Sequence, residues 1–184
     1  NTLTGFADSD LGGWMDGRSR VGWSIKFGDL HHRNAAFMYN CSLERPRFDN
    51  TADAEQAAFT RLGGSVFRAL ELAKECGFKV EGLVDVFSDN RPMINRMRNP
   101  IRAVSKRQTH LQYWKVVAWC NETEEDRIMR LLWISGKWNA SDQWTKVQGD
   151  KLLFRRCRKL TMNLADAVDD VDAKIPEDMY ESEQ

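Results

Sequence analysis

The sequence lacks several features that would assign it to other classes of protein. No stretch of 18 consecutive apolar residues is present, so we expect no membrane-spanning helix. No signal peptide is visible, and the four cysteines form no CxxC pair and have no histidine at zinc-ligand spacing. These absences argue against a disulfide-stabilised secreted protein and against a zinc site. We expect a soluble, intracellular, single-domain protein, and the missing initial methionine suggests a piece of a longer chain.

The charged residues are unevenly distributed along the chain. The whole chain holds 27 basic and 27 acidic residues. Residues 164–184 contain eight acids and one lysine, so this segment carries −7 and the preceding body carries +7. A basic body suits an anionic partner such as nucleic acid, and a solvated lysine-rich surface is the alternative interpretation. The acidic segment has little to bury and is predicted to be a flexible tail or linker, which leaves residues 1–163 as the domain.

The hydrophobic pattern predicts a mixed α/β chain. Apolar residues alternate with small or polar ones in three early segments, which indicates an antiparallel meander. The period then becomes helical over residues 54–76, and Gly77 follows as a stop signal. Within this helix, Gly63-Gly64 indicates close backbone packing or a kink. The expected elements are strands over 3–7, 21–27, 34–41, 80–88 and 128–134, and helices over 54–76, 90–97, 106–121 and from 142 onward.

Four acids occupy positions where a carboxylate needs a partner. Asp8 ends the first predicted strand, and Asp89 closes the fourth. Glu55 lies on the inward stripe of the long helix, and Asp142 opens the last helix. If the first and fourth strands are neighbours, these four carboxylates converge and repel one another. A pair of divalent ions that prefer hard oxygen ligands, Mg²⁺ or Mn²⁺, resolves this repulsion and supports phosphoryl displacement.

The spacing of the acids also has a simpler interpretation. A chain with 27 acids offers many such quartets. On periodicity alone, Asp89 and Asp142 are interpreted as helix caps. Asp8 and Glu55 fit that interpretation less well.

Six short motifs contain or separate the four acids. They are residues 7–13, 16–22, 51–55, 88–90, 109–111 and 140–146. In this order and with these gaps, they resemble the ribonuclease H domain of copia-type retrotransposon polyproteins. The motifs are weak singly but specific jointly, and they cover nearly the whole predicted domain.

The resemblance implies a fold, an activity and a setting. The implied fold is a five-stranded mixed sheet flanked by helices, and the implied activity is metal-dependent cleavage of the RNA strand of an RNA–DNA hybrid. The implied cofactor is a pair of Mg²⁺ ions, for which Mn²⁺ substitutes. Carried over motif by motif, the catalytic metal ligands are Asp8, Glu55, Asp89 and Asp142. The implied partner is the reverse-transcriptase domain of the same polyprotein, in a cytoplasmic virus-like particle or in the nucleus.

The segment before the last acid departs from the pattern of many relatives of this family. Residues 134–141 contain no histidine, and Lys137 and Trp138 occupy the loop. A hybrid is gripped by its shape, phosphates and 2′-hydroxyls, so basic residues near the motifs are the candidates for contact. These candidates are Arg18, Arg20, Lys106, Arg107 and Lys137. Two other functions stay open: a catalytically silent scaffold or binding module in a larger assembly, and a nuclease of the same fold that cuts DNA.

Overall fold

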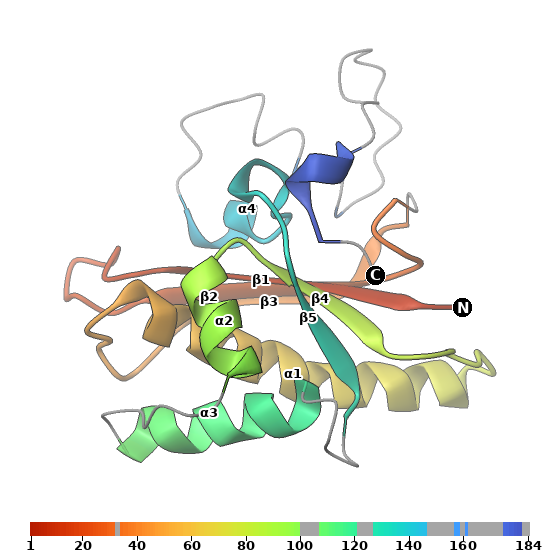
Figure 1. Ribbon diagram of the computed structural model, residues 1–184, viewed down its shortest axis with the longest axis horizontal. Coiled ribbons are helices and arrows are strands. Elements are labelled where there is room, and N and C mark those ends of the chain that lie inside the picture. The colour runs from red at the N-terminus through yellow and green to blue at the C-terminus, as the bar shows by residue number, and fades with distance from the viewer. Residues whose placement is uncertain are drawn as a thin grey trace.

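A five-stranded mixed sheet organises the protein (Figure 1). The computed structural model describes residues 1–31, 34–99, 107–120, 127–146, 157–158, 161 and 175–181. In spatial order the strands are β3 (Ala36–Leu43), β2 (Arg20–Phe27), β1 (Leu3–Asp10), β4 (Val84–Ser88) and β5 (Met129–Trp133). The helices are α1 (Thr51–Glu75), α2 (Arg91–Arg98), α3 (Arg107–Cys120) and α4 (Asp142–Thr145), with short 3₁₀ helices η1 (Gly136–Trp138) and η3 (Glu177–Met179).

The strand pairing confirms the predicted meander and extends it. β1 pairs antiparallel with β2, and β2 pairs antiparallel with β3. β4 then runs parallel to β1, and β5 runs parallel to β4. The mixed sheet flanked by helices is therefore confirmed. The fourth strand begins at Val84 instead of residue 80, because Gly82 has a positive φ of 72° and interrupts the extended backbone just before it.

Helix α1 forms because its local signals and its buried stripe agree. The Asn50 side chain caps it by accepting a hydrogen bond from the Asp53 N–H (2.9 Å), and Gly77 follows its last turn with a φ of 79°. A Cβ atom added to Gly63 would lie 2.4 Å from the Trp119 ring of α3. The glycine pair therefore marks close helix packing, and α1 is continuous through it.

The two faces of the sheet are covered differently. In Figure 1, α1 and α3 lie below the sheet, and α4 lies above it. The helix face buries the larger apolar cluster, which includes Ile25, Leu62 and Val86. We call the opposite face of the sheet the site face, and it buries a smaller apolar cluster around Phe6 and Phe87. Within the part of the chain that the structure describes, no helix is long and apolar enough to cross a membrane.

The C-terminal end of the chain differs from the flexible tail that its composition predicts. Residues 175–181, which we call the C-terminal strap, lie against β5, where Tyr180 forms an antiparallel bridge with Ile134. Ile175 is buried in the cluster of the site face. The strap thus buries apolar side chains. The average composition of residues 164–184 does not reveal them, because acidic residues surround them in the sequence. The other residues of the predicted tail lie outside the described ranges, and the proposed boundary at residue 163 stays a prediction.

Candidate active site

Strand register brings the first two acids of the predicted set together. In the parallel pairing of β1 with β4, Phe6 lies opposite Phe87. Asp8 and Asp89 each follow two residues later, so they meet at the same edge of the sheet. Asp142 is the first residue of α4, which packs on β1 and β2. Carboxylate oxygens of Asp8, Asp89 and Asp142 all lie within 4.8 Å of one another, and we call these three residues the acid cluster.

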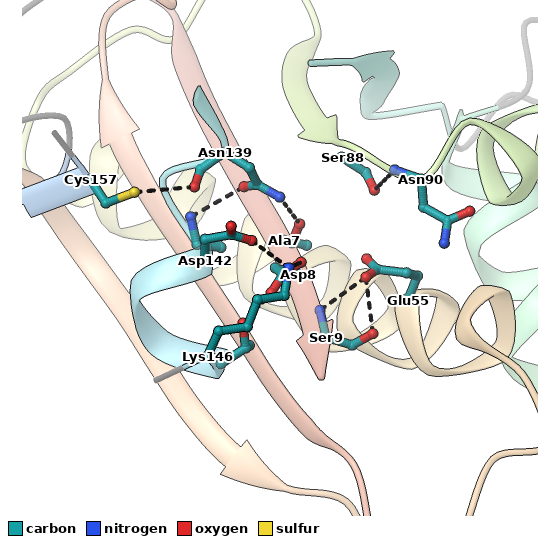
Figure 2. Close-up of polar contacts among 12 residues, drawn as sticks. Ala7, Asp8, Ser9, Glu55, Ser88, Asn90, Asn139, Asp142, Lys146 and Cys157 are labelled. Atoms are coloured by element: carbon teal, nitrogen blue, oxygen red, sulfur yellow. Dashed lines mark hydrogen bonds and ion pairs between the residues drawn. The ribbon is translucent and has the colours of Figure 1, made fainter. Parts of the chain in front are cut away.

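Glu55 approaches the acid cluster from α1. Its Oε1 accepts hydrogen bonds from the Ser9 N–H (3.1 Å) and the Ser9 hydroxyl (3.0 Å). Figure 2 shows Glu55 and Asp142 on opposite sides of Asp8. The Glu55 Oε2 is buried and has no hydrogen-bond partner among the described residues. An orphaned carboxylate oxygen beside other acids is costly unless a cation completes the site.

Burial and mutual repulsion perturb the acids strongly. Burial, reinforced by Asp142 and Asp89 and opposed by Lys146, raises the pKa of Asp8 from 3.8 to about 7. Burial, with the charges of Asp8 and Asp89, raises the pKa of Glu55 well above its ordinary value. Burial likewise raises the pKa of Asp89. Perturbed carboxyl groups that converge in this way are typical of functional sites.

Thr145 and Lys146, which belong to the last motif and have no role predicted from the sequence, lie beside the acid cluster. The Lys146 Nζ lies 2.7 Å from the Asp142 Oδ1 and 3.3 Å from the Asp8 Oδ1, and the Thr145 hydroxyl donates to the Asp8 Oδ2. Burial acts to lower the pKa of Lys146, but the Asp8 and Asp142 carboxylates raise it above its ordinary value. The spacing of four residues between Asp142 and Lys146 on a predicted helix was the available signal.

The loop before α4 fixes the position of Asp142 through a buried asparagine. The Asn139 Nδ2 donates to the Ala7 carbonyl of β1 (3.1 Å), and its Oδ1 accepts from the Ser141 N–H (3.2 Å). The Asp142 N–H donates to the Asn139 carbonyl (3.2 Å). Asn139 therefore ties the start of α4 to the strand that carries Asp8, as Figure 2 shows.

The interpretation of two acids as helix caps is wrong. The residue that caps α2 is Asn90, whose side chain accepts from the Met93 N–H (2.9 Å). Ser141 occupies the cap position of α4, where its side chain makes no capping hydrogen bond, and Asp142 lies inside the helix. Asp89 and Asp142 are therefore free of the capping role and available to the cluster.

The predicted nucleic-acid contacts have varied surroundings. The Arg18 Nε binds the Asp16 carboxylate (2.7 Å), and the Arg20 guanidinium lies 5.0 Å from the centre of the Trp14 ring. Lys137 is exposed on η1. Arg107 opens α3 but its side chain is not among those described, and Lys106 lies outside the described residues. These contacts stay predictions.

Comparison with known proteins supports the fold. No protein-family model matches the chain, and no curated protein matches it. Among solved structures, LC11-RNase H1, isolated from compost by a metagenomic approach, superposes with a TM-score of 0.54 at 14% sequence identity in its complex with an RNA/DNA hybrid. That match covers 78% of this chain and 94% of LC11-RNase H1. The N-terminal RNase H domain of Rv2228c from Mycobacterium tuberculosis gives 0.51 at 13% identity, over 79% of this chain and 96% of that one.

The chain has the ribonuclease H fold. Identities this low show the fold and leave the activity and the copia-type origin as proposals. Because this fold is associated with divalent metal ions, we compare the residues at the site with the ligands that such ions prefer. Three buried or half-buried carboxylates with converging oxygens, and a fourth with an orphaned oxygen, form the hard donor set that divalent cations prefer. The residues therefore fit a divalent metal site.

Proposed function

We propose that this protein is a metal-dependent endoribonuclease that hydrolyses the RNA strand of RNA–DNA hybrids. The observation that carries the proposal is the convergence of Asp8, Asp89 and Asp142 within 4.8 Å, beside the orphaned Oε2 of Glu55, on a ribonuclease H fold. Acids so arranged hold cations and do not attack the substrate, which suits phosphodiester hydrolysis.

The donor set suggests the identity of the cofactor. Asp8, Glu55, Asp89 and Asp142 would hold two Mg²⁺ ions, and Mn²⁺ would substitute for them, since all four ligands are carboxylates. When bound, such ions supply an activated water and stabilise the charge on the leaving oxygen.

The remaining residues of the site hold these ligands in place. Ser9 orients Glu55, Thr145 orients Asp8, and Asn139 fixes the start of α4. Lys146 offsets part of the repulsion between Asp8 and Asp142. Its side chain is 41% exposed, so it can swing into solvent when cations enter. Ligands held by such supporting contacts need little rearrangement to bind a metal.

The proposed substrate agrees with the charge of the domain. The body of the chain carries +7, and exposed Lys137 follows Gly136, whose backbone lies close to Asp89. A hybrid bound through its phosphates loses affinity as salt increases. We further propose a retrotransposon origin, the reverse-transcriptase domain of the same polyprotein as a partner, and a cytoplasmic particle or the nucleus as the location. The motif resemblance alone supports these three proposals.

The test compares hybrid cleavage by the unaltered chain and by Asp89→Asn. We expect Mg²⁺-dependent cutting of the RNA strand of a labelled hybrid, with no cutting of duplex DNA, and its loss in the variant. Glu71→Gln is the control. Glu71 is an exposed acid of α1, so this substitution removes the same charge at a position away from the site. Equal cutting by Asp89→Asn, or cutting of duplex DNA, would contradict the proposal.

One observation favours a second function, a catalytically silent scaffold that binds nucleic acid. Lys146 already supplies a cation to two of the three clustered acids. In a scaffold this lysine would replace the metal permanently. Binding of the hybrid without cleavage, unchanged by Mg²⁺ and by Asp89→Asn, would support the scaffold over the enzyme.

A further inference from the structure

The C-terminal strap pairs with the chain at the end of an edge strand, β5. β5 is an edge strand, and the backbone groups on such an edge need partners. The Ser135 N–H donates to the Met179 carbonyl (2.8 Å), and the Glu181 N–H donates to the Trp133 carbonyl (2.9 Å). The strap therefore pairs with the chain where β5 leads into η1.

The Glu181 side chain strengthens this pairing. Its Oε2 accepts from the Trp133 N–H (3.2 Å) and from the Arg98 Nη2 of α2 (2.6 Å). The same Nη2 donates to the Leu131 carbonyl (2.7 Å). Burial acts to raise the pKa of Glu181, but the hydrogen bonds from Arg98 and Trp133 hold it below its ordinary value. Glu181 thus clamps both the backbone of β5 and the end of α2.

Apolar packing joins the strap to the loop that precedes α4. Ile175 is 5% exposed, and Met179 and Tyr180 pack against the cluster of the site face. That cluster also contains Trp138 and Ala140, the residues on either side of Asn139. The strap therefore supports the loop that positions Asp142 by packing in the same cluster.

A second route leads from the strap to Asp89. The Trp133 indole Nε1 donates to the Asp89 carbonyl (3.3 Å), and the Arg91 guanidinium lies 3.7 Å from the centre of the Trp133 ring. Directly after β5, the backbone of Gly136 lies so close that an added Cβ would be 2.8 Å from the Asp89 Oδ2. Trp133 and Gly136 therefore both lie against Asp89, one at its backbone and the other at its side chain.

We infer that the strap is a positioning element of the acid cluster, and that Glu181 is a positioning residue which acts through Trp133 on Asp89. The inference rests on the proposed function in one respect, that the cluster binds a divalent metal. Metal affinity depends on how well the ligands are held before the ion arrives, so a strap that holds Asp89 and the loop before Asp142 sets that affinity. Glu181 then serves the site without touching it.

The experiment measures Mn²⁺ binding to the full chain by calorimetry, without nucleic acid. Glu181→Ala should bind Mn²⁺ about threefold to tenfold more weakly than the unaltered chain, because the support of a ligand is lost and the ligand is kept. Glu177→Ala is the matched control, since this exposed acid of the same strap carries the same charge and should leave the affinity unchanged. Glu181→Gln keeps an acceptor for the Trp133 N–H and should fall between the two.

Thermal unfolding of each variant separates positioning from general support. A strap with a purely structural role would lower the unfolding temperature of Glu181→Ala and leave the Mn²⁺ affinity of the folded protein equal to that of Glu177→Ala, which would overturn the inference. Hybrid cleavage distinguishes this failure from failure of the proposed function. Equal Mn²⁺ affinities with cleavage intact overturn the inference alone, and a weaker affinity in Glu181→Ala with no cleavage by any variant overturns the nuclease alone.

Discussion

The two faces of the sheet divide stability and chemistry between them. The helix face is covered by regular elements, above all α1 with 25 residues, and its buried cluster is apolar. Among the elements that the structure describes, those over the site face are short: the four-residue α4, the turn η1 and the strap. Buried polar side chains gather there, including Asp8, Asn139 and Asp142. A long amphipathic helix stabilises the fold by burying its stripe, whereas short irregular segments can aim single side chains.

The acid cluster reduces the stability of the site face. Buried carboxylates that raise one another's pKa are unfavourable when ionised, and the apolar helix face offsets that cost. Substitutions on the two faces should therefore have opposite consequences. Substitutions of the site acids, including Glu55 of α1, should remove activity and spare or increase stability. Substitutions in the apolar packing of the helix face should lower stability and spare activity.

The largest expected effect is on activity, for Glu55→Gln. Removing the charge of Glu55 should lower hybrid cleavage by roughly a thousandfold or more, as expected for loss of a metal ligand. The same change should raise the free energy of unfolding of the metal-free protein by about 1 kcal/mol at neutral pH, because a buried, repelled carboxylate disappears. Single-turnover cleavage and urea unfolding in EDTA measure the two quantities. A loss of stability together with the loss of activity would show that Glu55 supports the fold instead.

The next effect is on stability, for a pair of neighbouring glycines on the helix face. Gly63→Ala places a Cβ 2.4 Å from the Trp119 ring and should lower the free energy of unfolding by about 1–3 kcal/mol. Gly64→Ala is the matched control, because its added Cβ meets no atom of another described element within 4 Å, and it should stabilise α1 by about 0.5–1 kcal/mol. Urea unfolding measures both, and cleavage per folded molecule should stay constant. Equal effects of the two changes would contradict the close packing of α1 on α3.

A third prediction concerns pH. The pKa of Asp8 is about 7 in the folded protein and near 3.8 when unfolded, so the folded state binds more protons between these values. In EDTA, Asp8 therefore lowers the free energy of unfolding as pH rises from about 4 to about 7, by up to a few kcal/mol at roughly 1.4 kcal/mol per unit. Mn²⁺ affinity should rise over the same window, since the ligand must lose its proton.

The pH effect is isolated by comparison with Asp8→Asn. The stability of this variant relative to the unaltered chain should increase from pH 4.5 to pH 7.5, because asparagine does not titrate. Urea unfolding in EDTA at several pH values gives the difference directly. Two parallel stability curves would show that Asp8 keeps an ordinary pKa in the folded protein.

The smallest expected effect is on substrate affinity, for Lys137→Gln. Lys137 is exposed on η1, so removing one phosphate contact should weaken hybrid binding about twofold to fivefold and reduce the slope of affinity against salt by about 1. Both lysine substitutions are made in the Asp89→Asn protein, which should not cleave the hybrid, and hybrid affinity is measured at several salt concentrations. Lys79→Gln is the control, since Lys79 is an exposed lysine that pairs weakly with Glu81. A salt slope that is the same in both variants would remove Lys137 from the interface.

Local patterns predicted the elements and drew attention to four acids, and the resemblance of short motifs to a known family made these acids candidate metal ligands. The helical stripe of α1, with Glu55 on its inward face, follows from a period of 3.6 residues, and the meander follows from alternation. Asp8, Asp89 and Asp142 were singled out because each belongs to a short motif at the boundary of a predicted element. Such patterns span only a few residues of the chain, so they can be recognised without knowledge of the fold.

Only the tertiary structure decided what these elements place side by side. The position of β4 beside β1, in the register that brings Asp8 next to Asp89, depends on pairing between residues 81 apart in the sequence. Lys146 lies beside the acid cluster because α4 packs on β1. The strap lies against the end of β5 because its few apolar residues pack in the cluster of the site face, although their neighbours are acidic. Such contacts depend on which surfaces remain exposed after the sheet and helices have assembled, and no local period records that.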